Sequence, residues 1–595
     1  MFNYLIPKAF LITNEKIENE HLQNSHSLSN GYTLYVSEDT NVSSHHSNLG
    51  KAYLLGYAFD NTAPEMNSEQ ILESVLNEQL SATSHNINHL NGSFVIIKDT
   101  ENGIEVFSDA AGFRSPYYTA DLKIVSSHDK LIGDIFGNKK MYSSTKTLDY
   151  SRYADVYKLV PSNKLIIGQS KARIFPNPEI KELNYEEILD KLKLQINNLN
   201  VALDLVKNNL LVSITGGVDS KCTLALTKPI NKPVKTFTYI KEIEAITNKR
   251  AKNIYKTDKL IVERLVNNLN IDHELIEFQV DQADKEFSKN MYDVTGTVFN
   301  HPIAEIFEEK FKDEPEDVLQ FRSVIYSNAK FDYPKAFLTK KLTITDLYDY
   351  LQHKQIKTIK SEDEAKAAID AYLTRTETEI EPENIIRTLD VIHIDSRMGN
   401  WHSQLIKETD RVMDYFNYLN DRSTLNILLQ LPYEIRKYHL LHKDLIDAYW
   451  PILNFFEGNV NGNLYELERN KIMSTIAKDA GVEEVINFKF NFDYKDHTIA
   501  LIPNVNLKDT QMIRYRLSIL NEKETKLYST YEKEAGRNYI SVSITNNEEK
   551  KVLDIVDLSK GILLQANERY DIEIKYHKPT TTNSWVKAGT LYLHT

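Results

Sequence analysis

Cysteine is nearly absent from this sequence, and glycine is scarce. The chain of 595 residues has a single cysteine, Cys222. One thiol excludes a disulfide framework and a cysteine-based zinc site within one chain. Because only 19 of the residues are glycine, two glycines in tandem inside a recognisable motif rarely arise by chance.

Basic residues in excess and long apolar runs are also missing. The formal net charge is −13, which argues against a nucleic-acid partner, since such a partner usually requires a basic surface. No apolar run approaches the ~20 residues that span a bilayer. The first residues, Met1 to Lys8, lack a charged leader followed by an apolar core. We therefore expect a cytoplasmic protein, and the length indicates two to four domains.

The tandem glycines lie in the most informative segment of the chain, residues 215–220. An apolar run, Leu210 to Ile214, precedes them and predicts a buried parallel strand, and helical spacing follows them. Free N–H groups at the start of a helix bind phosphate, and glycines let the backbone approach it closely. Two hydroxyls add donors, and Asp219 is expected to hold Mg²⁺ beside the phosphates of ATP. The predicted nucleotide-binding residues are Thr215, Gly216, Gly217, Val218, Asp219 and Ser220.

This segment resembles the Ser/Thr-Gly-Gly-x-Asp-Ser loop of the N-type ATP pyrophosphatases. That group includes asparagine synthetase, the β-lactam synthetases, GMP synthetase and tRNA-thiolating enzymes. A Walker loop is absent here. The alternative interpretation is a tight strand-to-helix turn that binds no ligand.

Residues 1–180 are predicted to be rich in β-strands. Gly92–Asp99 and Ile104–Asp109 alternate in polarity across a turn and predict a hairpin. Leu90–Phe94 and Asp109–Tyr118 resemble the signature of the class II glutamine amidotransferase domain of asparagine synthetases. The resemblance implies an N-terminal-nucleophile-like fold of stacked antiparallel sheets. The family's nucleophilic cysteine at position 2 is replaced by Phe2, so we expect no glutamine hydrolysis.

Residues 181–485 are predicted to form a doubly wound parallel α/β domain. A helix over Tyr185–Val206, the strand before the glycines, and strands over Val234–Ile240 and Asp272–Phe278 alternate with helices. Ligands in such folds bind at the carboxyl ends of the strands. The resemblance places Thr238 and Tyr239 along the adenosine, and it makes Asp258 an acidic residue that opens the second helix. For Asp258, a helix N-cap is the alternative interpretation.

The second phosphate loop of the family is degenerate in this chain. Its positional counterpart, Phe321–Lys330, has neither the glycines nor the acidic pair of the Gly-x-Gly-x-Asp-Glu pattern. Arg322 is a candidate to neutralise pyrophosphate directly, because a guanidinium binds phosphate in a bidentate manner. Tyr326 is a candidate proton relay. For both residues, a packing or surface role is the alternative.

The segment from Asp395 to Ser403, with Asp414 after it, resembles the block that lines the acyl-acceptor side of the family's cleft. The resemblance makes Arg397 and Asp414 candidate catalytic residues. Asp414 would orient or deprotonate the attacking amine. The alternative for Asp395 and Arg397 is a buried structural ion pair.

Residues 486–595 lie outside the resemblance. Short segments of alternating polarity, separated by turn clusters, predict an antiparallel β-sandwich. Such a module could bind a glycan, a partner protein or a second copy of the chain.

These patterns together predict an ATP- and Mg²⁺-dependent ligase that forms an amide through an adenylated carboxylate. Its substrates would be small-molecule, peptide or polymer-linked acids and amines. Two alternatives stay open. The chain could be an inactive relative that binds a nucleotide as a scaffold or regulatory partner, as the degenerate second loop indicates. It could also thiolate tRNA, although that branch generally has paired cysteines and a basic surface.

Overall fold

The structure, a computed structural model, divides the chain into two compact units, residues 1–460 and 461–595. It describes residues 6–142, 148–279, 282–313, 317–356, 359, 361–458, 463–464, 467–469, 471–472, 475, 482–485, 488–493, 498–503, 512–518, 525–546, 549–578 and 583–594. Phe2 lies outside these residues. The described part is a mixed α/β protein with one parallel sheet and four antiparallel sheets.

Two six-stranded antiparallel sheets occupy the first part of the chain and share one apolar core. One sheet has the order β10-β8-β9-β1-β3-β2, with β1 (Phe10–Thr13), β2 (Asn24–Ser27), β3 (Thr33–Val36), β8 (Tyr117–Thr119), β9 (Val125–Ser126) and β10 (Val156–Lys158). The other has the order β12-β11-β7-β6-β5-β4, with β4 (Val42–Ser47), β5 (Gly50–Asp60), β6 (Leu90–Thr100), β7 (Gly103–Ser108), β11 (Asn163–Ile166) and β12 (Ser170–Arg173). The predicted hairpin is the antiparallel pair β6–β7.

The parallel sheet has the order β15-β14-β13-β16-β17. Its strands are β13 (Asn209–Ser213), β14 (Val234–Lys241), β15 (His273–Phe278), β16 (Val318–Phe321) and β17 (Met413–Phe416). All four pairings are parallel. The chain runs outward from β13 in one direction and then returns to its other side, so the switch point lies between β13 and β16. Ligands of such sheets bind at this point, beyond the carboxyl ends of the strands.

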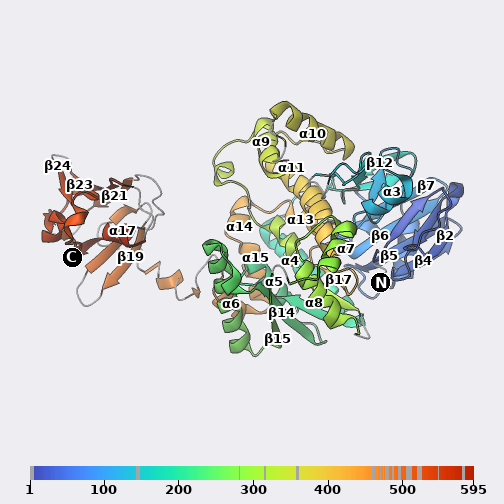
Figure 1. The fold of residues 1–595 in the computed structure, drawn as a ribbon, viewed down its shortest axis with the longest axis horizontal. Helices are drawn as coiled ribbons and strands as arrows, with labels where there is room; N and C mark the ends of the chain where they lie inside the picture. The colour runs from blue at the N-terminus through green and yellow to red at the C-terminus, as the bar shows by residue number, and fades with distance from the viewer. Residues whose placement is uncertain are drawn as a thin grey trace. The chain divides into compact units, whose positions relative to one another are not determined.

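Helices connect and cover this sheet (Figure 1). They are α4 (Tyr185–Leu205), α5 (Val218–Leu226), α6 (Lys249–Leu269), α7 (Lys285–Thr295) and α8 (His301–Phe311). Asn184 caps α4 through a capping box, and helix α5 packs against α15 (Leu440–Tyr449). The prediction that Asp258 opens or caps the second helix is wrong. Helix α6 begins at Lys249, where the Asn248 side chain accepts from the Ala251 N–H, and no glycine or proline interrupts it before Asp258.

A group of helices with its own core lies between β16 and β17 in sequence. Helices α9 (Ile344–Lys354), α10 (Glu362–Arg375) and α11 (Ile385–Ile392) pack together through residues such as Leu347, Ile369 and Leu389 (Figure 1). Helix α11 continues into a π-helix, η5 (His393–His402), and then α12 (Ser403–Lys407). π-Helical segments are rare and are often found at functional sites. The remaining helices of this unit include α1 (Ser68–Leu76), α2 (His85–Asn88), α3 (Asp129–Phe136), η3 (Val324–Ala329), α13 (Arg422–Leu428), α14 (Tyr433–Lys437) and η6 (Pro451–Phe455).

The second unit contains two five-stranded antiparallel sheets with a common core. One has the order β18-β21-β26-β23-β24 and the other β19-β20-β27-β22-β25. Their bounds are β18 (Val482–Val485), β19 (Phe488–Asp493), β20 (Thr498–Pro503), β21 (Met512–Ser518), β22 (Thr525–Ser529), β23 (Ile540–Thr545), β24 (Lys550–Asp554), β25 (Ile562–Leu564), β26 (Arg569–Tyr576) and β27 (Leu591–His594), with helix α17 (Asn583–Ala588). Leu527 and Leu591 of one sheet share this core with Val542 and Ile572 of the other. Buried apolar residues therefore alternate along β23 and β26 as the sequence pattern predicted, while the side chains of β19 and β21, which were predicted to alternate too, lie outside the described ones. The predicted boundaries at residues 180 and 485 stay predictions.

Across the described residues, none of the helices combines the length and the apolar character that crossing a membrane requires.

Candidate functional site

The Gly-Gly loop follows β13 directly and leads into α5, at the switch point of the parallel sheet. Gly217 is the N-cap of α5, with φ −79° and ψ 153°. Any residue can adopt this backbone, so conformation does not require glycine at this position. A Cβ atom added there would lie 3.3 Å from Thr215 Oγ1. That one contact leaves room at the start of α5, and N–H groups that open a helix are of the kind that bind a phosphate.

The two hydroxyls of the motif hold the loop in shape. Ser220 Oγ accepts from the Thr215 N–H at 3.0 Å and lies 3.0 Å from Thr215 Oγ1. Thr215 Oγ1 also accepts from the Gly217 N–H at 3.2 Å. The structure thus places both predicted hydroxyls together, bonded to the loop itself.

Asp219, in the first turn of α5, is engaged by two cationic or potentially cationic side chains. Lys330 Nζ lies 2.7 Å from Asp219 Oδ2, and His442 Nε2 lies 3.1 Å from Oδ1. Burial raises the pKa of Asp219, but His442 and Lys330 outweigh this effect and hold the pKa below its usual range. Asp219 is therefore a paired carboxylate.

The residues around Asp219 do not fit a Mg²⁺ ion held by the protein. Oδ2 accepts a hydrogen bond from Lys330 Nζ, and Oδ1 lies 3.1 Å from His442 Nε2 without a hydrogen bond to it, whereas Mg²⁺ requires several oxygen ligands at short range. Within the described ranges, no group of three or more His, Cys, Asp or Glu side chains is arranged to hold a metal ion. We therefore derive no catalytic step through Mg²⁺.

The predicted adenosine-side residues lie on the neighbouring strand. Thr238 of β14 is buried and donates its hydroxyl to the Ile214 carbonyl at 2.6 Å, which ties β14 to the start of the loop. Tyr239 is half-buried and stacks on Phe237 with ring centroids 6.0 Å apart. Asp258 is half-buried within α6. Of the three candidates, Thr238 is buried, and Tyr239 and Asp258 are half-buried.

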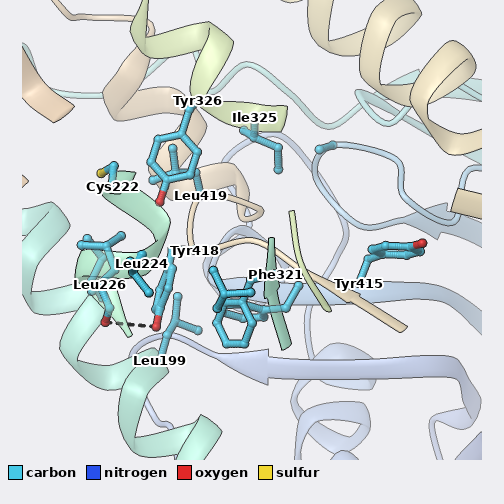
Figure 2. Close-up of a cluster of buried hydrophobic side chains, with 14 of the residues drawn as sticks. Leu199, Cys222, Leu224, Leu226, Phe321, Ile325, Tyr326, Tyr415, Tyr418 and Leu419 are labelled. Atoms are coloured by element: carbon cyan, nitrogen blue, oxygen red, sulfur yellow. Dashed lines mark hydrogen bonds between the residues drawn. The ribbon is translucent and has the colours of Figure 1, made fainter. Parts of the chain in front are cut away.

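Arg322 and Tyr326 follow β16, on the other side of the switch point. The Arg322 guanidinium lies 4.9 Å from the centre of the Tyr415 ring. Tyr326 is 1% exposed and belongs to the apolar cluster in Figure 2, where its hydroxyl points into the interior near Cys222. Burial raises the pKa of Tyr326 well above its ordinary value. This environment favours a packing role for Tyr326.

The only cysteine of the sequence lies in the same cluster. Cys222 is fully buried in α5. Burial raises the pKa of its thiol, because the thiolate would lose its hydration. Cys222 is therefore a packing residue, and it offers no nucleophile for glutamine hydrolysis.

Asp414 lies apart from the loop, in an ion-pair network with the first part of the chain. Its Oδ1 lies 2.7 Å from Lys8 Nζ and 2.8 Å from Arg114 Nη2. The second nitrogen of Arg114 binds Asp410 at 2.6 Å. In β17, Asp414 is opposite Leu319, two residues before the carboxyl end of β16. Burial raises the pKa of Asp414, but Lys8 and Arg114 outweigh it and hold the pKa low.

A cavity of about 330 Å³ lies beside Lys330, and we call it the Lys330 cavity. Its walls come from η3, α9, α11, the π-helix and α14. The lining residues are Ser327, Asn328, Lys330, Asp332, Tyr333, Tyr350, Lys354, Gln355, Asp390, His393, Arg397, Trp401 and Arg436. Because Lys330 also contacts Asp219, the Lys330 cavity adjoins the Gly-Gly loop.

Arg397 reaches this cavity from the π-helix. Its guanidinium carbon lies 3.5 Å from the centre of the Trp401 ring, a cation–π contact. No described carboxylate is ion-paired with it. The alternative that paired Arg397 with Asp395 is wrong, since the buried Asp395 contacts Arg173 instead, at 3.4 Å. This leaves the Arg397 charge available to a ligand.

His393, one helical turn earlier, also lines the cavity. Its Nε2 lies 3.0 Å from Ser327 Oγ. Burial lowers the pKa of His393 to about 4, so the ring is neutral at pH 7.

Sequence reasoning missed Lys330, His442 and His393. Lys330 is the last residue of the segment that aligns with the second phosphate loop. The family pattern ends in acidic residues, so the positive charge of Lys330 is the one signal that the sequence offers. His442 and His393 carry no sequence signal, because their roles depend on contacts with residues 66 or more positions away.

No protein-family model and no curated protein matches the chain. Among solved structures it is similar to the NH₃-dependent NAD synthetase from Campylobacter jejuni, at 18% identity and a TM-score of 0.17, over 36% of this chain and 94% of that one. It is also similar to the glutamine-dependent NAD⁺ synthetase from Acinetobacter baumannii, at 12% identity and a TM-score of 0.16, over 40% of this chain and 57% of that one. A third is the structure of accessory secretory protein 1, 2 and 3 in Streptococcus pneumoniae, at 15% identity and a TM-score of 0.12, over 19% of this chain and 91% of that one. TM-scores this low carry no argument, so any functional assignment rests on the residues of the site.

Proposed function

We propose that the chain is an AMP-forming amide ligase, in which ATP activates a carboxylic acid that a substrate amine then attacks. The observation that carries this proposal is the Thr-Gly-Gly-Val-Asp-Ser loop at the switch point of a parallel sheet, next to a cavity with unpaired positive charge. Free carboxylates react poorly with amines because their leaving group is poor. Transfer of AMP to the acid releases pyrophosphate and supplies a good leaving group, and the amine then displaces AMP.

The loop is proposed to hold the phosphates. The N–H groups at the start of α5 point at the anion, with the helix dipole favouring negative charge there. Thr215 and Ser220 keep the loop in place through their mutual hydrogen bonds. Arg322, on the neighbouring loop after β16, is a candidate to neutralise the departing pyrophosphate. Positioning and charge neutralisation account for most of the rate in such a reaction.

The Lys330 cavity is proposed to hold the acid and the amine. Arg397 and Lys354 line it without a described carboxylate partner, and they supply positive charge for the acid. Asp332 lines it as well, and it is the acidic side chain there that no described cation neutralises. We assign to Asp332 the orientation of the amine, in place of Asp414, whose carboxylate already binds Lys8 and Arg114.

ATP–pyrophosphate exchange tests the proposal directly. Purified protein is incubated with ATP, labelled pyrophosphate and pooled carboxylate-bearing metabolites. Exchange should depend on an added acid and should be lost in Gly217→Val, whose side chain fills the space in front of α5 without straining the backbone. Thr257→Val, on the exposed face of α6, serves as the control. Tight ATP binding without any exchange would contradict the proposal.

A nucleotide-binding scaffold without catalysis is the second candidate. The pairing of Asp219 with Lys330 and His442 favours it, because the carboxylate that the resemblance assigns to Mg²⁺ is already occupied. The same exchange experiment separates the two candidates.

A further inference from the structure

We propose that Lys330 supplies the positive charge beside the nucleotide phosphates at the place where the resemblance puts a Mg²⁺ ion on Asp219. ATP would then bind without a metal ion held by the protein. The inference rests on the proposed function, since it concerns the same loop. It departs from what the resemblance implies, because a side chain takes the place of the metal.

Both oxygens of Asp219 lie close to nitrogen atoms of basic side chains. Lys330 Nζ lies 2.7 Å from Oδ2, and His442 Nε2 lies 3.1 Å from Oδ1. The Lys330 and Asp219 side chains are 18% and 26% exposed, so the pair is shielded from solvent but still reachable by a ligand. An ammonium group and a metal ion cannot occupy the same position against one carboxylate oxygen.

The second observation is that the segment aligned with the family's second phosphate loop supplies no carboxylate, and that Asp332, which lines the Lys330 cavity, lies beyond this segment. The segment Phe321–Lys330, which aligns with the family's second phosphate loop, contains no acidic residue. The described ranges contain no group of three or more side chains suited to a metal. A carboxylate that already accepts from an ammonium group is a poor Mg²⁺ ligand, since this ion is usually bound by one or two free carboxylates together with phosphates.

The backbone of Lys330 is held in place by a buried ion pair. Arg436 Nε donates to the Lys330 carbonyl at 3.1 Å. Arg436 is itself fixed, because both of its terminal nitrogens bind Asp390, at 2.7 and 2.8 Å. This buried pair holds the backbone of Lys330 in front of Asp219. The lysine is therefore placed by the fold, and it does not depend on a flexible loop for its position.

The pairing of Lys330 with Asp219 also determines the net charge that a phosphate would meet at this site. An ammonium group has three N–H donors, and the described contacts of Lys330 Nζ use one of them, with Asp219. The others are free to donate to phosphate oxygens. The negative charge of Asp219 alone would repel a polyphosphate, but the Asp219–Lys330 pair is neutral. With the N–H groups that open α5, the site becomes attractive to an anion without a metal ion.

The experiment is a titration of the full-length protein with ATP, once in EDTA and once in excess Mg²⁺, by isothermal calorimetry. Wild-type protein should bind ATP in EDTA, with an affinity within about threefold of that in Mg²⁺. Lys330→Met should weaken binding in EDTA about tenfold or more, the usual effect of losing a charge-assisted contact. Lys330→Arg should retain binding. Lys366→Met, which removes an exposed charge from α10, should leave ATP affinity unchanged.

The variant Asp219→Asn should change ATP affinity in the opposite direction from Lys330→Met. If Lys330 is the cation for the phosphates, the amide releases the ammonium group and affinity in EDTA stays equal or rises. If Asp219 binds Mg²⁺, the variant loses Mg²⁺-dependent binding. Wild-type binding that requires Mg²⁺ and is lost in Asp219→Asn would overturn this inference and leave the proposed ligase intact. Absence of ATP binding under both conditions would instead overturn the proposed function.

Discussion

At the scale of single residues, the site is defined by which charges are paired and which are not. Asp219, Asp390 and Asp414 each bind a basic side chain: Lys330, Arg436, and both Lys8 and Arg114. Arg397 instead rests on Trp401. Paired carboxylates position their partners, and the unpaired guanidinium is left for a ligand. We expect replacement of a buried paired residue such as Asp390 to destabilise the fold, and replacement of the unpaired Arg397 to affect ligand binding.

Replacement of Asp390 tests the positioning role. Asp390 and Arg436 are 4% and 2% exposed, and Tyr333 also donates to Asp390 at 2.6 Å. Asp390→Asn leaves the Arg436 charge buried without a counter-charge, so the free energy of unfolding should fall by about 3–5 kcal/mol. Glu383→Gln, in the exposed Lys341–Glu383 pair, should change it by less than about 1 kcal/mol. Urea unfolding measures both; equal effects would contradict the expectation.

The buried Lys407 should make the stability of the protein depend on pH. Its side chain is fully buried, and burial lowers its pKa to about 8, whereas an unfolded lysine titrates near 10.4. Between these values the unfolded chain binds a proton that the folded chain does not, so stability should rise with pH from about 8 to about 10. Lys407→Met should flatten this slope and remove roughly 2 kcal/mol of the change.

The measurement is urea unfolding of wild type and Lys407→Met at a series of pH values in that window. Lys341→Met, on an exposed lysine, is the control and should keep the wild-type slope. A slope that is unchanged in Lys407→Met would show that Lys407 keeps its proton when the protein folds.

At the scale of elements, the π-helix is fixed against the first part of the chain by a close backbone approach. A Cβ atom on Gly399 would lie 2.4 Å from Pro161 Cδ, and one on Gly112 would lie 2.8 Å from the Gly399 Cα atom. Both contacts are closer than packed atoms allow. Gly399 is also flanked by Arg397 and Trp401, so this packing sets where their side chains enter the Lys330 cavity.

Gly399→Ala should therefore move the π-helix. We expect a loss of about 1–3 kcal/mol in the free energy of unfolding, as for other overpacked sites, together with a weaker affinity for the acid substrate. Thermal unfolding and the acid concentration giving half-maximal exchange are the two readouts. Ala367→Ser, on the exposed face of α10, should change neither. Unchanged values in Gly399→Ala would mean that the two segments separate without cost.

Elements of the parallel sheet could be predicted from sequence, and most of the side-chain pairing in the site could not. Strand β13, the Gly-Gly loop and helix α5 follow one another within a short stretch, so the local pattern of polar and apolar residues and the two adjacent glycines predict them. The pairing of Asp219 with Lys330, or of Asp414 with Arg114, joins segments that are distant in sequence. The sequence around each of these residues contains no signal for such a distant contact. The start of α6 was misplaced because its polar first turns are held by the Asn248 cap and carry no apolar stripe.

At the scale of the whole molecule, the two compact units have separate apolar cores. Among the described residues, the core of the second unit is built from residues between Ile499 and Leu593, and the cores of the first unit from residues before 460. Units with their own cores generally fold by themselves. The candidate site lies entirely within the first unit.

The last prediction follows from this division. Residues 1–460 and 461–595, produced as separate proteins, should each unfold cooperatively, and calorimetry of the full chain should show two transitions at the same temperatures. The smaller unit should contribute a heat-capacity change of roughly 1.6–2 kcal/mol/K, which its size implies. Because the Gly-Gly loop and the Lys330 cavity belong to the first unit, residues 1–460 should bind ATP with the affinity of the full chain. A single transition in the full chain, absent from both pieces, would show that the units stabilise each other, and the site would then have to be studied only in the intact protein.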